Sequence, residues 1–330
     1  MANAFTSCVG TVGEGIYVSP NAGKSWNRVT GPFPAPYENE IRSLAIDPNN
    51  PHRIIAGSDV GIYSSDDNGL NWKKMDSPMD GKQIWSVTVH PGDPNTIFAG
   101  TKPPAIYRSK DGGESWEQLP ADIAKECFAG EPKVTSIVVD PREHRTIWMG
   151  VEIDGVFKSM DGGDTWTHMS PLGEDVLHQD IHSVGVSAGQ RTQIVAATPA
   201  GVFSSSDEGE SWELHEFPRF NPDDPFSYCR GITVSPGDPD TMFVGNGDTI
   251  PGDTGTIQRT KDGGRTWEAA PLPVDPNSNI YWVGMHPANP NRIVANSING
   301  EIYVSDDAGD SWEKIKREFG EIRAIAWLPN

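Results

Sequence analysis

Seven equivalent positions of a repeated strand hold polar or aromatic residues, although the strand around them is rich in small aliphatic residues. Three of the seven are arginines, whose guanidinium groups bind carboxylates, phosphates and sulfates through paired hydrogen bonds. Histidine and tyrosine transfer protons, and flat aromatic rings commonly line ligand pockets. If the repeats surround one axis, these side chains converge on it. The residues are Arg42, Trp85, Thr135, His182, Arg230, Tyr281 and Arg323.

These residue types predict an anion-binding pocket with acid–base groups beside it. As catalytic residues we predict His182 and Tyr281, with Glu152 assisting His182. As ligand-binding residues we predict Arg42, Arg230, Arg323, Trp85, His178, Lys102 and Asp248, the last three from nearby loops. No cofactor is predicted. The one metal hypothesis is a divalent ion near His178 and His182, although two histidines without tight spacing are a weak signal.

A structural interpretation of the same residues carries comparable weight. Acidic residues stand two places before three of the seven positions, so each carboxylate can lie beside the cationic or titratable group that follows it. In this hypothesis the seven side chains hold neighbouring repeats together. The expected pairs are Glu40 with Arg42, Asp180 with His182, and Glu321 with Arg323.

The elements that position these residues repeat along the whole chain. The phrase Ser-x-Asp-x-Gly-x-Ser/Thr-Trp, complete at residues 109–116, recurs seven times and ends at tryptophans spaced 44 to 55 residues apart. A period of this length is typical of repeat architectures. In the second copy, the alternating strand 41–46 is followed by the turn 47–51, strands at 53–57 and 61–64, and a short strand around Trp72.

Four antiparallel strands in each of seven repeats predict an all-β protein, a single seven-bladed β-propeller. The chain begins at the second strand of a unit and ends with an isolated first strand, which is expected to complete the N-terminal blade and close the ring. Residues 1–330 then form one domain. The expected blades are 1–30 with 321–330, and approximately 40–76, 83–120, 133–170, 180–216, 228–271 and 279–316.

The repeated phrase resembles the Asp-box, or BNR repeat, of sialidases, xyloglucanases, sortilin-type receptors and photosystem assembly factors. Three copies depart from the phrase, with Asn21 for Asp, Asn71 for Ser/Thr and Thr260 for the first Ser. Each substitute keeps a side-chain acceptor, so all seven turns are expected to form. The resemblance implies that the box is structural and lies on the face away from the functional site.

Charge and composition exclude several kinds of partner. The formal net charge is −20, from 46 acidic and 26 basic residues, which disfavours nucleic acids and anionic membranes. The N-terminal residues carry no secretory signal pattern. Three widely spaced cysteines, Cys8, Cys127 and Cys229, indicate free thiols. We therefore expect a cytoplasmic protein.

Two functional hypotheses follow. The first is a hydrolase- or lyase-type enzyme that binds an anionic or polyhydroxylated small molecule in the axial pocket opposite the boxes. It is not a typical sialidase, because the Arg-Ile-Pro motif is absent and sialidases have six blades; xyloglucanases place their site between two propellers, and one is expected here. The second is a noncatalytic binding or assembly-factor propeller that recognises an acidic peptide or protein on the loop face.

Overall fold

The computed structural model describes residues 5–33, 40–189 and 192–330. Residues 1–4 of the expected first blade, the segment 34–39 and residues 190–191 lie outside the described residues. In the described part, 28 strands form seven four-stranded antiparallel sheets, and the one 3₁₀ segment is η1 (Val176–Gln179). No helix in that part is long and apolar enough to span a membrane.

Each sheet is one blade, and its strands follow one another outward from the axis. Blade 1 contains β28 (Ile322–Pro329), β1 (Phe5–Thr11), β2 (Ile16–Ser19) and β3 (Asn27–Val29). Blade 2 contains β4 (Ile41–Asp47), β5 (Asn50–Ser58), β6 (Gly61–Ser65) and β7 (Lys73–Met75). Blade 3 contains β8 (Gln83–Val89), β9 (Ile97–Lys102), β10 (Ala105–Ser109) and β11 (Glu117–Gln118). Blade 4 contains β12 (Val134–Val139), β13 (Ile147–Val151), β14 (Gly155–Ser159) and β15 (Thr167–His168).

The last three blades have the same order. Blade 5 contains β16 (Ser183–Ala188), β17 (Thr192–Thr198), β18 (Gly201–Ser205) and β19 (Glu213–His215). Blade 6 contains β20 (Tyr228–Val234), β21 (Met242–Gly247), β22 (Gly255–Thr260) and β23 (Glu268–Ala269). Blade 7 contains β24 (Ile280–Met285), β25 (Ile293–Ser297), β26 (Ile302–Ser305) and β27 (Glu313–Lys314).

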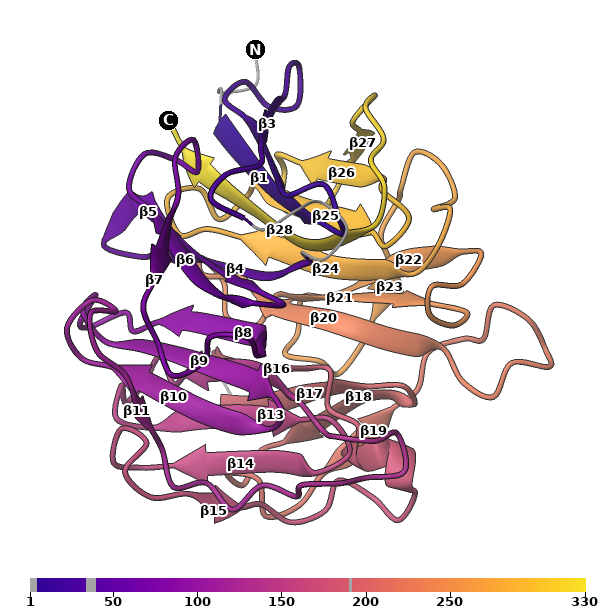
Figure 1. Ribbon diagram of the computed structural model, residues 1–330. Coiled ribbons are helices and arrows are strands. Elements are labelled where there is room, and N and C mark those ends of the chain that lie inside the picture. The colour runs from indigo at the N-terminus through magenta and orange to yellow at the C-terminus, as the bar shows by residue number, and fades with distance from the viewer. Residues whose placement is uncertain (1–4, 34–39, 190–191) are drawn as a thin grey trace.

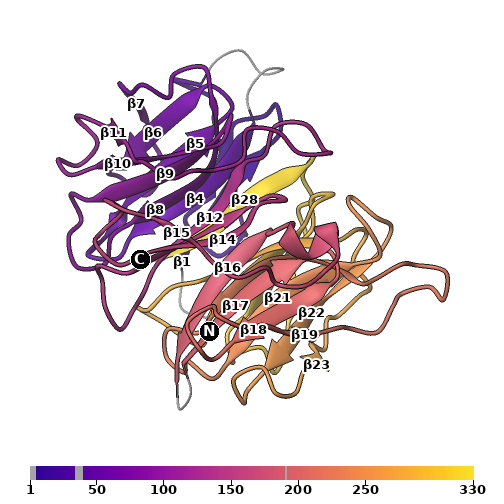
Figure 2. The same ribbon diagram turned by 90° about the horizontal axis from the view of Figure 1, so that it is seen from below.

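The blades close into a ring. The innermost strands contact one another in the order β4, β8, β12, β16, β20, β24, β28 and back to β4. Strand β28 pairs antiparallel with β1 from Phe5↔Pro329 onward, which joins the two ends of the chain in one sheet. Figures 1 and 2 show the yellow C-terminal strand beside the indigo N-terminal strand. The predicted propeller and its mode of closure are therefore confirmed.

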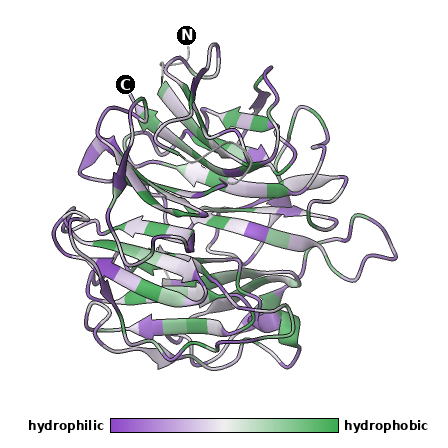
Figure 3. Ribbon diagram, in the orientation of Figure 1, coloured by the Kyte–Doolittle hydropathy of each residue, from purple (hydrophilic) through white to green (hydrophobic). Residues whose placement is uncertain are grey.

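The hydrophobic core is divided into seven clusters, one between each pair of adjacent blades. In Figure 3 hydrophobic segments recur along the strands. Every box tryptophan packs against the cluster shared with the preceding blade, as Trp72 does between blades 2 and 1. The cluster of Phe5, Trp327 and their neighbours closes the interface between blades 7 and 1. Blade stability therefore depends on an intact ring, because each core needs two blades.

All seven box turns form with one hydrogen-bond pattern. In the third copy, Ser109 Oγ donates to Asp111 Oδ1 (2.8 Å), which also accepts from the Ser115 N–H (2.9 Å). Asn21 accepts from the Ser25 N–H in the same way (2.9 Å). The first-position Thr260 likewise donates to Asp262 (2.8 Å). The substituted copies therefore keep the turn.

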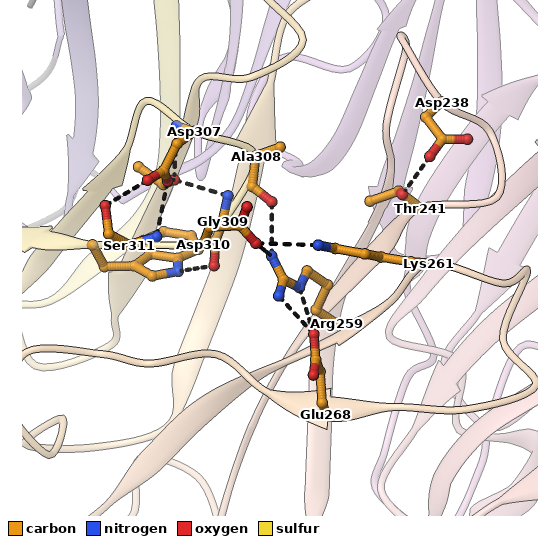
Figure 4. Close-up of polar contacts among 12 residues, drawn as sticks. Asp238, Thr241, Arg259, Lys261, Glu268, Asp307, Ala308, Gly309, Asp310 and Ser311 are labelled. Atoms are coloured by element: carbon orange, nitrogen blue, oxygen red, sulfur yellow. Dashed lines mark hydrogen bonds and ion pairs between the residues drawn. The ribbon is translucent and has the colours of Figure 1, made fainter.

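Some box turns are also tied to the neighbouring blade. Figure 4 shows the turn of blade 7, with Arg259 reaching it from blade 6. The Arg259 guanidinium donates to Asp310 (2.7 Å) and to the Ala308 carbonyl (3.1 Å), and it also binds Glu268 within its own blade (2.6 Å). Arg259 is 6% exposed, and its bonds stay on the face that carries the boxes. Arg259 is therefore a structural arginine.

We expect Asp111→Ala to lower the melting temperature more than Asp111→Asn does. Hydrogen bonds from the Ser115 side chain and backbone lower the pKa of Asp111 to about 2. An amide keeps the acceptor for the backbone N–H, as Asn21 shows, whereas alanine keeps none. Thermal unfolding of both variants at pH 7 checks this. Equal losses would show that the side-chain acceptor does not stabilise the turn.

Candidate functional site

A cavity of about 370 Å³ runs along the axis of the ring and is lined by residues from all seven blades. The strand ends at its mouth lie opposite the box turns, because the boxes connect the third and fourth strands of each blade. All seven residues predicted to face the axis line it. We call them the inner ring: Arg42, Trp85, Thr135, His182, Arg230, Tyr281 and Arg323.

β-Bulges place six of the seven inner-ring residues. In blade 2, Ile41 pairs with Ser58 and Ser43 with Gly57, so Arg42 has no partner in the register. A bulge leaves the extra residue unpaired and redirects its side chain. In five other blades the pairing register of the innermost strand shifts at the equivalent residue. These residues are Trp85, Thr135, Tyr281 and Arg323, and Arg230 together with Gly231. His182 directly precedes β16 and donates its N–H to the Ala197 carbonyl (2.9 Å).

A glycine in the second strand stands opposite the bulge in five blades. These residues are Gly10, Gly57, Gly100, Gly150 and Gly245. A Cβ at Gly100 would lie 2.4 Å from Val134 Cγ1 of the next blade, so glycine lets the neighbouring strand approach closely. This recurrent glycine is the signal from which the bulges could have been predicted.

A second ring of polar residues lies two places before the inner ring. It consists of Glu40, Gln83, Lys133, Asp180, Tyr228, Asn279 and Glu321. The residue between the two rings is apolar in every blade, as at Ile41, which has no exposed surface. Only the three acidic members, Glu40, Asp180 and Glu321, were predicted from the sequence. Lys133 and Tyr228 were not, although the polar–apolar–polar alternation indicates them.

Two of the three predicted pairs are ion pairs, and the third places the Asp180 carboxylate beside His182. Arg42 Nη2 lies 2.8 Å from Glu40 Oε2, Arg323 pairs with Glu321, and His182 Nε2 lies 3.3 Å from Asp180 Oδ2. Arg42 also pairs with Asp59. Most of the charge of the inner ring is therefore balanced within the protein.

Trp85 connects two of the balanced cations. The Arg42 guanidinium lies 4.1 Å and the Lys133 ammonium 4.2 Å from the centroid of its rings, both in cation–π geometry. Lys133 in turn pairs with Glu152. The predicted catalytic residue Glu152 is thus linked to the inner ring through Lys133.

Arg230 differs from the other cations of the two rings. Its Nη2 donates to the Tyr281 hydroxyl (2.9 Å), and its guanidinium lies 4.6 Å from the centroid of that ring. Among the described residues no carboxylate lies within ion-pair distance of it, and Asp180 acts on it only at longer range. Arg230 is half-buried, and a charge that is partly withdrawn from water without a counter-charge is unfavourable. Arg230 is therefore the position where an anionic ligand would gain most.

Tyr281 accepts hydrogen bonds from two arginines. Arg323 Nη1 lies 3.4 Å from the same hydroxyl oxygen that Arg230 contacts. Tyr281 is 5% exposed, and burial alone would raise its pKa; Arg230 and Arg323 outweigh burial and lower the pKa below its usual value. Arg323 Nε is buried and has no hydrogen-bond partner in the described structure. Arg230, Tyr281 and Arg323 form what we call the arginine–tyrosine cluster.

His182 is held on both ring nitrogens. Nδ1 donates to the Cys229 carbonyl (2.6 Å), so in the neutral ring Nε2 accepts from the Tyr228 hydroxyl (3.2 Å). Burial, and then the charge of Arg230, lower the pKa of His182. Burial raises the pKa of Tyr228 to about 12. A ligand would reach His182 Nε2 only by displacing Tyr228 or Asp180.

His182 predicts a specific acid sensitivity. Because its folded-state pKa lies below the usual 6.5, the unfolded chain takes up this proton first as the pH falls below 6.5. The free energy of unfolding then decreases through that window. We expect melting temperatures measured from pH 7 downward to fall more steeply for the wild type than for His182→Gln. Parallel curves would contradict a buried neutral histidine.

The remaining predicted residues, Lys102, His178 and Asp248, are not among those that line the axial cavity. Lys102 ends β9, and Asp248 accepts from the N–H groups of Thr249 (2.9 Å) and Asp253 (3.2 Å) in its own loop. His178 lies in η1, with its ring centroid 5.1 Å from that of Phe203. No cluster of three or more His, Cys, Asp or Glu side chains suited to a metal occurs in residues 5–33, 40–189 and 192–330. The hypothesis of a divalent ion near His178 and His182 gains no support there.

One family model matches this chain over most of its length. The family model described as Sortilin-Vps10 (sortilin, neurotensin receptor 3) matches residues 60–176 and 200–327, which is most of the chain. The chain belongs to the Sortilin-Vps10 family. The predicted superfamily is therefore confirmed.

The chain is also similar to xyloglucanases and to a photosystem assembly factor. A probable oligoxyloglucan-reducing end-specific xyloglucanase of Neosartorya fischeri is 27% identical over 279 residues, which are 81% of this chain and 32% of that protein. The chain thus spans about a third of its length. The GH74 enzyme structure from Niastella koreensis has a TM-score of 0.68 at 18% identity, covering 98% of this chain and 52% of that one. The structure of YCF48 bound to D1 peptide has a TM-score of 0.62 at 15% identity, covering 93% and 87%. At these identities the two structures show the fold alone.

Proposed function

We propose that this Sortilin-Vps10 family propeller binds a small anionic or polyhydroxylated molecule in its axial cavity and acts on it as a hydrolase- or lyase-type enzyme. The observation that carries the proposal is Arg230, a half-buried guanidinium with no carboxylate within ion-pair distance among the described residues. A ligand acid group between Arg230 and Arg323 would supply the missing negative charge.

The cavity and its lining support a small ligand. Its volume of about 370 Å³ falls in the range of small-molecule sites. Tyr281, the acid–base residue of the cluster, faces the same cavity. A xyloglucanase among the relatives acts on a sugar polymer by its name, which supports a carbohydrate ligand.

Peptide binding without catalysis is the second candidate function. YCF48 with its D1 peptide matches this chain over nearly the full length of both. Phe128 and Val176 are 67% and 50% exposed in the loops that connect blades 3 to 4 and 4 to 5. These apolar side chains on the connecting loops favour a protein partner.

Thermal-shift titrations with matched ligands separate the candidates. We would compare galacturonate oligomers with neutral galactose oligomers of equal length, and an acidic peptide with its amide-substituted analogue. The first proposal predicts that the uronate raises the melting temperature in proportion to the logarithm of its concentration, and more than the neutral oligomer of equal length does. A shift by the acidic peptide alone would favour the second candidate, and a shift by neither acid would refute both.

A further inference from the structure

The Tyr281 hydroxyl has an unused donor. Its oxygen accepts from Arg230 and Arg323, and no described residue accepts its own hydrogen. Because the hydroxyl also lines the cavity, the free hydrogen or the phenolate oxygen can act only on a ligand or solvent. Tyr281 is thus the acid–base group of the cavity that is not committed to a protein partner.

Four of the five carboxylates near the inner ring are paired with cations, and the fifth, Asp180, lies beside the neutral His182. Hydrolysis of a glycoside by paired carboxyl groups needs one as a proton donor and a second one free. Here Glu40 and Asp59 bind Arg42, and Glu321 binds Arg323. Asp180 lies against His182, and Glu152 binds Lys133. Proton abstraction by a phenolate does not require any of these carboxylates.

We propose that the site catalyses β-elimination on a 4-linked uronic acid glycoside, with the Tyr281 oxygen as the base. The inference rests on the proposed function and names its substrate class and reaction. The phenolate takes the proton from C5, next to the carboxylate, and the electron pair of that bond forms the C4=C5 double bond. The C4–O bond breaks, its electrons pass to the leaving oxygen, and that oxygen takes the proton back from Tyr281. No oxidant or other co-reactant is consumed.

The arginine–tyrosine cluster fits this chemistry. Removing a proton next to a carboxylate places further negative charge on that group, so donors that neutralise it stabilise the transition state. Arg230, without a carboxylate partner, and the unpartnered Nε of Arg323 are donors of this kind. The charged and titratable groups that act on Tyr281 are Arg230 from β20 and Arg323 from β28, with Tyr228 also coupled to it. Both arginines favour the phenolate.

The test uses the full chain with polygalacturonate, alginate and 4-linked glucuronan. Elimination produces ultraviolet-absorbing unsaturated uronate together with new reducing ends. Reducing ends without absorbance would overturn the inference and leave the proposed function standing. Absence of both, with a thermal shift by uronate oligomers, would also overturn elimination but keep binding. Absence of any shift would overturn the proposed function as well.

Two variants test whether Tyr281 is the base. Loss of a positioned acid–base group typically reduces turnover by about 100-fold or more, and we expect this for Tyr281→Phe. Tyr17→Phe is the matched control, since Tyr17 is equally buried, at 6% exposure, but outside the cavity lining. In a second measurement, Arg323→Gln shifts the ascending limb of the pH–rate profile, on which the base loses its proton, to higher pH, because one of the charges that lower the Tyr281 pKa is gone. Wild-type turnover by Tyr281→Phe, or an unshifted limb in Arg323→Gln, would overturn the assignment.

Discussion

Arg230→Met is expected to abolish binding of carboxylate ligands while leaving the fold as stable as the wild type or more so. Removing one partner of a buried charged contact costs about 2–5 kcal/mol. That corresponds to an increase in Kd of about 30-fold to several thousand-fold. Isothermal titration with galacturonate oligomers measures the loss.

The expected gain in stability has a separate cause. Arg230 has no carboxylate within ion-pair distance in the described structure, so methionine removes a half-buried charge and leaves no carboxylate unpaired. Replacing a poorly compensated buried charge with an apolar side chain of similar length is often neutral or stabilising. The Tyr281 hydroxyl keeps Arg323 as a donor. The melting temperature should therefore stay constant or rise.

Arg259→Met is the matched control for Arg230→Met. Arg259 is buried, and it binds Glu268, Asp310 and the Ala308 carbonyl on the box face (Figure 4). Its loss should lower the melting temperature and leave ligand binding unchanged. If Arg230→Met instead destabilised the protein as Arg259→Met does and kept full binding, Arg230 would be a structural residue.

Truncation after Glu321 is expected to unfold the protein. The cut removes β28, the innermost strand of blade 1, and with it the partner of β1. Ile322, Ile325, Trp327 and Leu328 leave two interblade clusters. Burial of such side chains stabilises by about 1.5–3 kcal/mol each, so four approach the 5–15 kcal/mol net stability of a typical protein.

Circular dichroism melting and gel filtration check this prediction. We expect a chain without a cooperative transition, which elutes as expanded or aggregated material. The control ends at Leu328 and lacks only Pro329 and Asn330. A cooperative transition near the wild-type temperature in the protein truncated after Glu321 would contradict the role of β28 in closing the ring.

The repeat made most of the fold predictable. Seven copies of one phrase gave the number of blades, and the incomplete units at the two ends of the chain implied that β28 joins β1. The inner ring followed because equivalent positions of a repeat point in equivalent directions. The pair of Arg42 with Glu40 was predictable for a similar reason, since residues two apart in a strand lie on the same side.

Contacts between blades were not predictable from the repeat. Lys133, at the start of blade 4, contacts Trp85 of blade 3. Arg230 of blade 6 contacts Tyr281 of blade 7. Which blade-to-blade neighbours meet depends on how far each bulge turns the side chain. His178 and Asp248 lie in connections of variable length, whose paths the repeat does not encode. Neither residue is among those that line the axial cavity. Of the partners of His182, Asp180 was predicted, whereas Tyr228 and the Cys229 carbonyl were not.

A crystal structure with a bound galacturonate trimer tests whether Arg230 and Arg323 hold a ligand carboxylate. We expect one sugar carboxylate within hydrogen-bonding distance of Arg230 and Arg323, with C5 of that sugar facing the Tyr281 hydroxyl. A trimer bound on another face, or one whose carboxylates all avoid Arg230, would contradict this expectation.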